Sequence, residues 1–223
     1  MTANPIRVVL IDDHAMVLES LSARLAINPQ IQIVGMAATC DEGFRVAIEQ
    51  KPDVVLLDVN LPGRGAFDLA EDLVSRRPDT RLIFVTGYLA DIYLEQALKL
   101  NASGYLLKGE PIHTLAKAII SAMADEKTFS ADVAERLSYD AATRKYAVKS
   151  QSSLSALTGR QLEVLKHLAK GESVKEIAKQ MHLSQKSVDS HKYRIMNKLG
   201  IHDRVELARF AIREGLSNPW GAP

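Results

Sequence analysis

The sequence predicts a two-domain protein: an α/β domain with a doubly wound, five-stranded parallel sheet of the flavodoxin-like type, followed by a small all-α domain of four helices. Apolar runs alternate with helix-period segments over the first 124 residues, which is the pattern of βα units around a parallel sheet. After residue 155 only helix signals occur. The 223 residues, 47% of them hydrophobic, supply enough apolar material for two cores.

Five short apolar runs are the expected strands. They lack polar alternation, so they suit a sheet that is covered by helices on both faces. The strands are expected at residues 6–11, 31–36, 53–57, 81–85 and 104–107. Amphipathic helices are expected at 14–27, 41–50, 66–77, 89–99 and 112–124. Chain breakers such as Asn28-Pro29 and Pro62-Gly63 fall between these elements.

The pattern changes after the fifth βα unit. Residues 1–124 are expected to form the first domain, and the polar segment 125–155 is expected to be a linker, helical in part near 130–140. Residues 156–217 would form the second domain, and 218–223 a tail. The four helices of the second domain are expected at 158–170, 173–181, 184–199 and 203–214. Each begins on or beside Thr, Ser or Asp, the residues preferred at helix N-termini.

The net charge of +1 hides an asymmetry between the two parts of the chain. Residues 1–150 have 16 basic and 20 acidic side chains, whereas residues 151–223 have 12 basic and 7 acidic ones. A basic second domain suggests a polyanionic partner, and chance variation in surface charge is the alternative. The lone Cys40 excludes an intramolecular disulfide. With no apolar run of about 18 residues and no signal peptide, a cytoplasmic protein without a membrane partner is expected.

Polar residues follow the predicted strands at one edge of the sheet. Asp12 and Asp13 follow the first strand, Asp58 the third, Thr86 the fourth and Lys108 the fifth. The carboxyl ends of parallel strands meet in one crevice, where three carboxylates would repel one another without a cation. Oxygen ligands of this kind suit Mg²⁺, and the whole set suits phosphoryl transfer to a carboxylate. The alternative for Asp58 is a cap on the following turn.

The segments "LIDDH", "VVLLDVNLPG", "FVTGY" and "GYLLKG" resemble the receiver domain of two-component response regulators, over residues 6–124. The resemblance implies that Asp58 accepts the phosphoryl group. It also implies a Mg²⁺ ion bound by Asp12, Asp13 and Asp58, with the backbone of Asn60 completing the metal shell.

The same resemblance assigns roles to three further residues. Thr86 and Lys108 would contact the phosphoryl group, and Tyr105 would be the switch aromatic that turns inward after phosphorylation. The family usually has Pro after the Lys, whereas this chain has Gly109, which leaves the positioning of Lys108 open.

The segment 175–201 has the pattern of a helix, a tight turn and a second helix. At 100° per residue, Val188, His191, Ile195 and Leu199 fall on one face of the second helix, which should be core. The opposite face should be exposed and suits the major groove of DNA. Its candidate base contacts are Lys186, Asp189, Ser190, Tyr193 and Asn197. Candidate phosphate contacts are Lys175, Lys179, Lys192, Arg194, Lys198 and Arg204. A solvated helical bundle is the alternative.

Residues 157–216 resemble a LuxR-type helix-turn-helix domain through "LTGRQL", "EVL", "GESVKEIA", "SQKSVDSH" and "KLG". The resemblance implies a recognition helix at about 185–199, and a last helix that forms the dimer surface. Candidate dimer residues are Val205, Ala208 and Arg209.

Together these patterns predict a response regulator transcription factor of the LuxR/FixJ (NarL-like) class, and not an enzyme. A sensor histidine kinase would phosphorylate Asp58, and this would control dimerisation and binding to double-stranded DNA. RNA polymerase is a further candidate partner. In one expected arrangement the resting receiver covers the DNA-binding helices. Two alternatives are a phosphorylation-independent DNA-binding regulator with a receiver-like dimerisation module, and a Mg²⁺-dependent phosphohydrolase.

Overall fold

The computed structural model describes residues 4–61, 65–87, 89–149, 153–214 and 216. The predicted break at Pro62-Gly63, residue 217 and the predicted tail 218–223 lie outside the described residues.

The described residues contain a parallel sheet with the order β2-β1-β3-β4-β5-β6. Its strands are β1 (Ile6–Ile11), β2 (Ile31–Ala37), β3 (Val54–Leu57), β4 (Arg81–Thr86), β5 (Gly104–Leu107) and β6 (Thr128–Phe129). The doubly wound fold is therefore confirmed, and the count of five strands is wrong because β6 pairs with the outer edge of β5. A strand of two residues has no apolar run that a sequence pattern could reveal.

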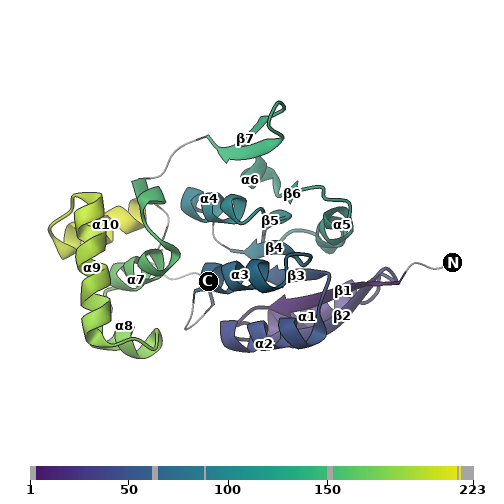
Figure 1. The fold of residues 1–223 in the computed structure, drawn as a ribbon, viewed down its shortest axis with the longest axis horizontal. Coiled ribbons are helices and arrows are strands. Elements are labelled where there is room, and N and C mark those ends of the chain that lie inside the picture. The colour runs from purple at the N-terminus through teal and green to yellow at the C-terminus, as the bar shows by residue number, and fades with distance from the viewer. Residues whose placement is uncertain (1–3, 62–64, 88, 150–152, 215, 217–223) are drawn as a thin grey trace.

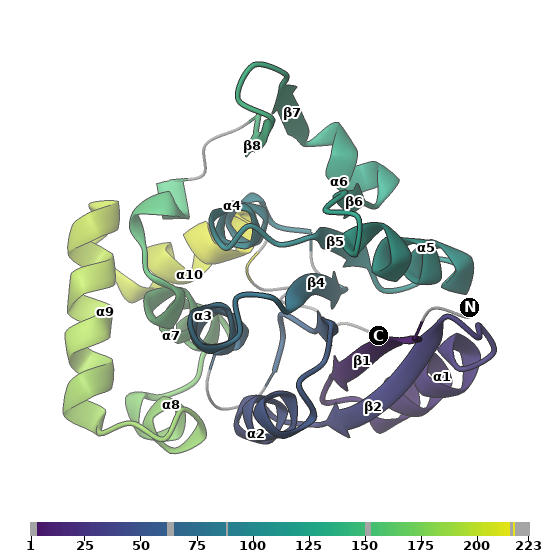
Figure 2. The same cartoon turned by 45° about the vertical axis from the view of Figure 1, so that its right-hand side comes forward.

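Helices cover both faces of the sheet, as Figures 1 and 2 show. They are α1 (Ala15–Leu25), α2 (Cys40–Gln50), α3 (Ala66–Arg76), α4 (Asp91–Lys99) and α5 (Ile112–Ala122). Successive residues of β1 point to opposite faces, so Val8 packs in the core with α1 and α5. Val9 packs in the core with α2, α3 and α4.

The segment predicted to be a linker contains more structure than its polar composition suggests. After β6 come α6 (Ala131–Glu135) and an antiparallel hairpin of β7 (Leu137–Asp140) and β8 (Lys145–Val148). A 3₁₀ turn, η1 (Ser153–Ala156), follows. The hairpin is joined to the α/β domain by ring contact of Tyr146 with Phe129, at 4.9 Å between centroids. Arg136 forms an ion pair with Asp91 of α4, with Nη1 and Oδ1 2.8 Å apart.

The predicted helical domain is confirmed, with α7 (Gly159–Ala169), α8 (Val174–Gln180), α9 (Gln185–Leu199) and α10 (Arg204–Arg213). Thr158 and Ser173 form capping boxes at the starts of α7 and α8, and Ser184 caps α9. Helix α9 ends at Gly200, whose φ of 66° is a left-handed conformation that favours glycine.

The two domains lie side by side, with α7 against α3 (Figure 2). Buried apolar residues of the helical domain, such as Leu162 and Leu165, belong to the same cluster as Phe67 and Leu69 of α3. Among the described residues, no helix has both the length and the apolar content needed to cross a membrane.

Candidate functional site

The strand ends bring the predicted acidic residues together. Strands β1 and β3 are neighbours, with Ile11 paired to Leu57, so Asp12 and Asp58 leave the sheet side by side. One ligand atom each from Asp12, Asp13, Asp58 and His14 can be chosen so that all lie within 4.8 Å of one another. The crevice predicted from the strand order is therefore present.

Lys108 reaches into this cluster from the end of β5. Its Nζ is 2.7 Å from Oδ2 of Asp12 and 2.8 Å from Oδ2 of Asp58. Burial opposes the charge of Lys108, but its hydrogen bonds to the two carboxylates outweigh burial and raise its pKa. Gly109 has a φ of 105°, a conformation that the ring of a proline forbids. Lys108 thus contacts both carboxylates even though Gly109, and not Pro, follows it.

The second oxygen of Asp58 is the unusual atom of the site. Asp58 is 3% exposed, and its buried Oδ1 has no hydrogen-bond partner among the described residues. A buried carboxylate oxygen without a partner is costly unless a cation or a reaction uses it. The three carboxylates outnumber Lys108, which fits a divalent cation. A Mg²⁺ ion would be held here by Asp12, Asp13, Asp58 and the Asn60 carbonyl. When bound, the ion would neutralise the charge on phosphoryl oxygens.

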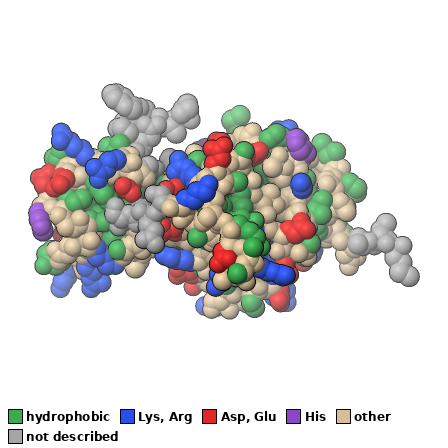
Figure 3. All heavy atoms as spheres, turned by 90° about the horizontal axis from the view of Figure 1, so that it is seen from above, with side chains coloured by type: hydrophobic (Ala, Val, Ile, Leu, Met, Phe, Trp, Pro, Cys, Tyr) green, Lys and Arg blue, Asp and Glu red, His purple; other side chains and the backbone are tan. Residues whose placement is uncertain are grey.

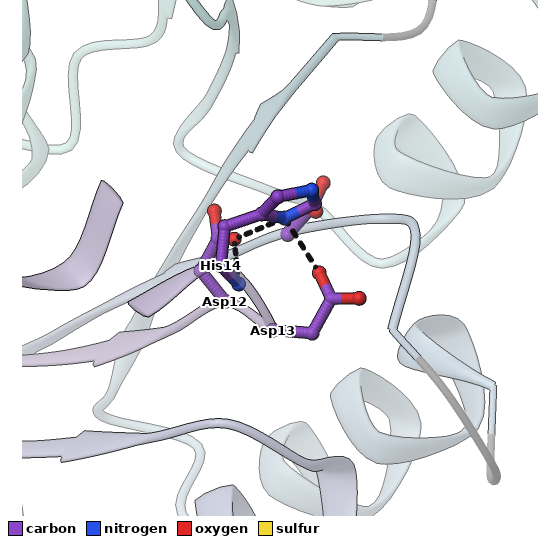
Figure 4. A group of neighbouring side chains, drawn as sticks. Asp12, Asp13 and His14 are labelled. Atoms are coloured by element: carbon purple, nitrogen blue, oxygen red, sulfur yellow. Dashed lines mark hydrogen bonds and ion pairs between the residues drawn. The ribbon is translucent and has the colours of Figure 1, made fainter. Parts of the chain in front are cut away.

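His14 joins the acidic pair and was not among the predicted site residues. Its Nδ1 is 3.0 Å from Oδ1 of Asp12 and 2.8 Å from Oδ1 of Asp13 (Figure 4). The ring thus lies where a cation would meet both carboxylates. The only sequence signal was its position next to the pair, which many surface histidines share.

Thr86 and Tyr105 lie on the two strands beside the acidic cluster. Thr86 is fully buried at the end of β4, and its carbonyl accepts a hydrogen bond from the Lys108 N–H at 2.7 Å. Tyr105 is also buried, and burial followed by the negative charge of Asp58 raises the pKa of its phenol. Tyr105 therefore occupies an inward position in this structure.

Helix α7 lies over the loop that follows Asp58, a contact that the sequence did not predict. Lys166 of α7 is 4% exposed, and its Nζ donates a hydrogen bond to the side-chain oxygen of Asn60. Glu163, one turn earlier, packs close to Gly65, where an added Cβ would lie 3.2 Å from the Glu163 Cγ. Burial lowers the pKa of Lys166 and raises that of Glu163.

The predicted base-contacting face of α9 is open to solvent. Tyr193 is 67% exposed, and Lys186, Asp189, Ser190 and Asn197 are exposed as well. On the opposite face Val188 and Ile195 are fully buried, while His191 and Leu199 are half-buried. The receiver-like domain contacts α7 and leaves this face of α9 uncovered, so in this structure it covers one helix of the helical domain but not the predicted recognition face.

The predicted phosphate contacts fall into two groups. Lys175 and Arg194 are exposed, and Lys192 is half-buried with its Nζ 3.1 Å from Oδ1 of Asp189. Lys198 instead donates to the Ala156 carbonyl at 2.7 Å and to Oε1 of Gln161 at 2.9 Å. It therefore ties the end of α9 to the start of α7. Basic side chains gather on the end of the molecule formed by the helical domain (Figure 3).

The predicted dimer residues lie on α10. Val205 is 59% exposed, Arg209 is exposed and Ala208 is half-buried. An exposed valine beside a half-buried alanine gives α10 a small apolar area that another surface can cover.

Comparisons with known proteins match both parts of the chain. The profile described as "Response regulator receiver domain" matches residues 8–120, and that of "Bacterial regulatory proteins, luxR family" matches 155–211. The chain is 31% identical to the response regulator UvrY of Escherichia coli K12 over 213 residues, 96% of each chain. It is 32% identical to the transcriptional regulatory protein LiaR of Bacillus subtilis over 213 residues, 96% of this chain and 100% of LiaR.

A solved structure extends the likeness to the fold. RcsB from Salmonella enterica serovar Typhimurium, bound to the promoter P1flhDC with the phosphomimetic BeF₃⁻, superimposes with a TM-score of 0.67. The match covers 93% of this chain and 98% of that chain at 24% identity.

Proposed function

Because this chain belongs to the LuxR-class response regulators, with a receiver domain joined to a LuxR-type DNA-binding domain, we propose that a sensor histidine kinase phosphorylates Asp58. The step depends on Mg²⁺ and controls dimerisation and sequence-specific binding to double-stranded DNA. Proteins of this family regulate transcription and are not in general enzymes. The proposed receiver domain is residues 1–124 and the proposed DNA-binding domain is residues 156–217. We place the protein in the cytoplasm, with RNA polymerase as a further candidate partner.

The buried Oδ1 of Asp58, which has no hydrogen-bond partner in the described part of the chain, is the observation that carries the phosphorylation half of this proposal. Oδ2 is held by Lys108 at 2.8 Å, so Oδ1 is the oxygen left to attack. Oδ1 forms a bond to phosphorus while the bond between phosphorus and the kinase histidine nitrogen breaks. The electron pair returns to the imidazole, and Lys108 and Thr86 bind the phosphoryl oxygens.

The exposed polar face of α9 supports the DNA-binding half. A helix that offers a lysine, an amide, a hydroxyl and an aromatic ring can contact base edges in the major groove. RcsB, which shares the fold, has been solved on promoter DNA. Dimerisation through α10 would join two half-site contacts and implies a target with an inverted repeat.

Intact-protein mass spectrometry after incubation with Mg²⁺ and a phosphodonor tests the proposal. The donors are a small acyl phosphate and a phosphorylated kinase domain. We expect one phosphoryl adduct on the wild type, and none on Asp58→Asn or after removal of Mg²⁺ by a chelator. DNA affinity should then rise in the phosphorylated wild type alone. A wild type that takes up no phosphoryl group from either donor contradicts the proposal.

The open face of α9 favours a second candidate function. Because the recognition helix is exposed while α7 contacts the receiver domain, the chain can also be proposed to bind DNA independently of phosphorylation. The same experiment separates the two functions. Equal DNA affinity of the wild type and Asp58→Asn under phosphorylating conditions supports the phosphorylation-independent regulator.

A further inference from the structure

Helix α7 of the DNA-binding domain places a second ammonium group at the phosphorylation site. Lys166 is buried, its Nζ donates to the side chain of Asn60, and Asn60 lies two residues after Asp58 in sequence. Burial lowers the pKa of Lys166, and the negative charges of Glu163, Asp58 and Asp13 oppose that shift. The receiver therefore holds one cation of its own, Lys108, and receives another from the domain that it regulates.

A cavity separates the two domains beside this contact. Its volume is about 270 Å³, and Asp13 and Asn60 from the receiver face Lys166, His167 and Lys170 from α7. The receiver side of the cavity carries the carboxylate of Asp13, and on the α7 side the two lysines outnumber the one carboxylate, that of Glu163. Complementary charge across the cavity favours the docked arrangement of the two domains.

Asp13, which lines the cavity, belongs to the cluster of carboxylates that suits a divalent cation. Asp12, Asp13 and Asp58 converge there, and the buried Oδ1 of Asp58 is without a hydrogen-bond partner among the described residues. A divalent cation and the ammonium of Lys166 would neutralise the same carboxylates. Two cations near each other in a partly buried site repel, so each weakens the binding of the other.

We propose that Lys166 is an interdomain counter-ion of the phosphorylation site, so that divalent-cation binding and the docking of α7 oppose each other. Coupling between two binding events is reciprocal. If docking lowers the affinity for the cation by some factor, binding of the cation lowers the equilibrium constant for docking by the same factor. Binding of Mg²⁺ thus loosens the docked arrangement before any phosphoryl transfer. The inference rests on the Mg²⁺ site of the proposed function and concerns how that site is regulated.

The first test compares Mg²⁺ affinities by calorimetric titration of the full-length chain at fixed ionic strength, without a phosphodonor. Lys166→Gln removes the charge and keeps a donor for Asn60, so we expect it to bind Mg²⁺ at least about fivefold more tightly than the wild type. Lys145→Gln, the same change at an exposed position on the β7–β8 hairpin, should match the wild type. Circular dichroism verifies folding, and Lys166→Arg, which keeps the charge, should also match the wild type.

The second test measures docking by small-angle X-ray scattering of the same full-length proteins. Mg²⁺ should increase the radius of gyration of the wild type, relative to NaCl at equal ionic strength. The increase should be smaller in Lys166→Gln, because no ammonium is left to be repelled.

The outcomes distinguish this inference from the proposed function. Equal Mg²⁺ affinity in the wild type and Lys166→Gln overturns the inference alone and leaves the phosphorylation chemistry intact. If neither protein binds Mg²⁺, the inference falls together with the metal half of the proposed function.

Discussion

Two lysines show how a side chain of one type takes different roles at the residue scale. Lys108 is held between Asp12 and Asp58, where its charge is paired with two buried carboxylates. Lys198 lies on the helix predicted to bind DNA, yet its ammonium is used by the Ala156 carbonyl and by Gln161. A lysine already bound in this way contributes to the stability of the fold, and contributes less to contacts with phosphate.

Lys198→Ala and Arg194→Ala should therefore have different effects. Arg194→Ala should reduce the slope of log affinity for DNA against log salt by about 1, because one phosphate contact is lost. Lys198→Ala should leave that slope unchanged and lower the free energy of unfolding by about 1 kcal/mol, because two hydrogen bonds are lost. DNA titrations at several salt concentrations and urea unfolding measure the two effects. A reduced salt slope in Lys198→Ala would mean that Lys198 does contact a DNA phosphate.

At the scale of the element, the sixth strand depends on one small residue of the fifth. Gly104 begins β5, and β6 lies against it, with the Thr128 N–H donating to the Ser103 carbonyl at 3.0 Å. A Cβ on residue 104 would be 2.8 Å from the Thr128 carbonyl oxygen, which is backbone and cannot rotate away. The pairing of β6 therefore requires glycine at this position.

Gly104→Ala should destabilise the receiver domain by about 1–3 kcal/mol, the usual cost of added atoms in a closely packed site. Gly87→Ala is the matched control, because an added Cβ there meets no atom within 4 Å among the described residues. Thermal and urea unfolding of the two variants measure the difference. Equal stability of both variants would mean that β6 pairs too weakly to resist the added methyl group.

At the scale of the whole molecule, the two domains share one apolar cluster while the DNA-binding surface faces solvent. Leu162 and Leu165 of α7 pack into the cluster that includes Phe67 of α3. The polar face of α9 and part of α10 remain exposed. The docked structure consequently leaves DNA contact open.

Val205→Asp should weaken binding to a DNA probe with two half-sites and leave binding to a single half-site unchanged. The carboxylate would lie in the apolar area of α10 that we expect the partner subunit to cover, where its burial is unfavourable. Ile27→Asp is the control, since Ile27 is an apolar residue on the receiver that is even more exposed than Val205, at 80%. Electrophoretic mobility shifts on the two probes provide the measurement. Unchanged affinity of Val205→Asp for the two-site probe would exclude Val205 from the dimer surface.

The sequence by itself determined the parallel sheet, the four C-terminal helices and the convergence of Asp12, Asp13, Asp58 and Lys108. Each of these follows from local signals. Apolar runs mark strands, capping residues mark helix starts, and the carboxyl ends of parallel strands meet at one edge.

Only the tertiary structure decided the pairing of β6, the use of Lys198 within the fold, and the contact of Lys166 with Asn60. Lys166 and Asn60 are 106 residues apart, and both lie in segments whose local pattern is complete without the other. A contact of this kind depends on how two finished domains dock. No periodicity or motif within either segment records that docking, so the sequence alone does not predict the contact of Lys166 with Asn60.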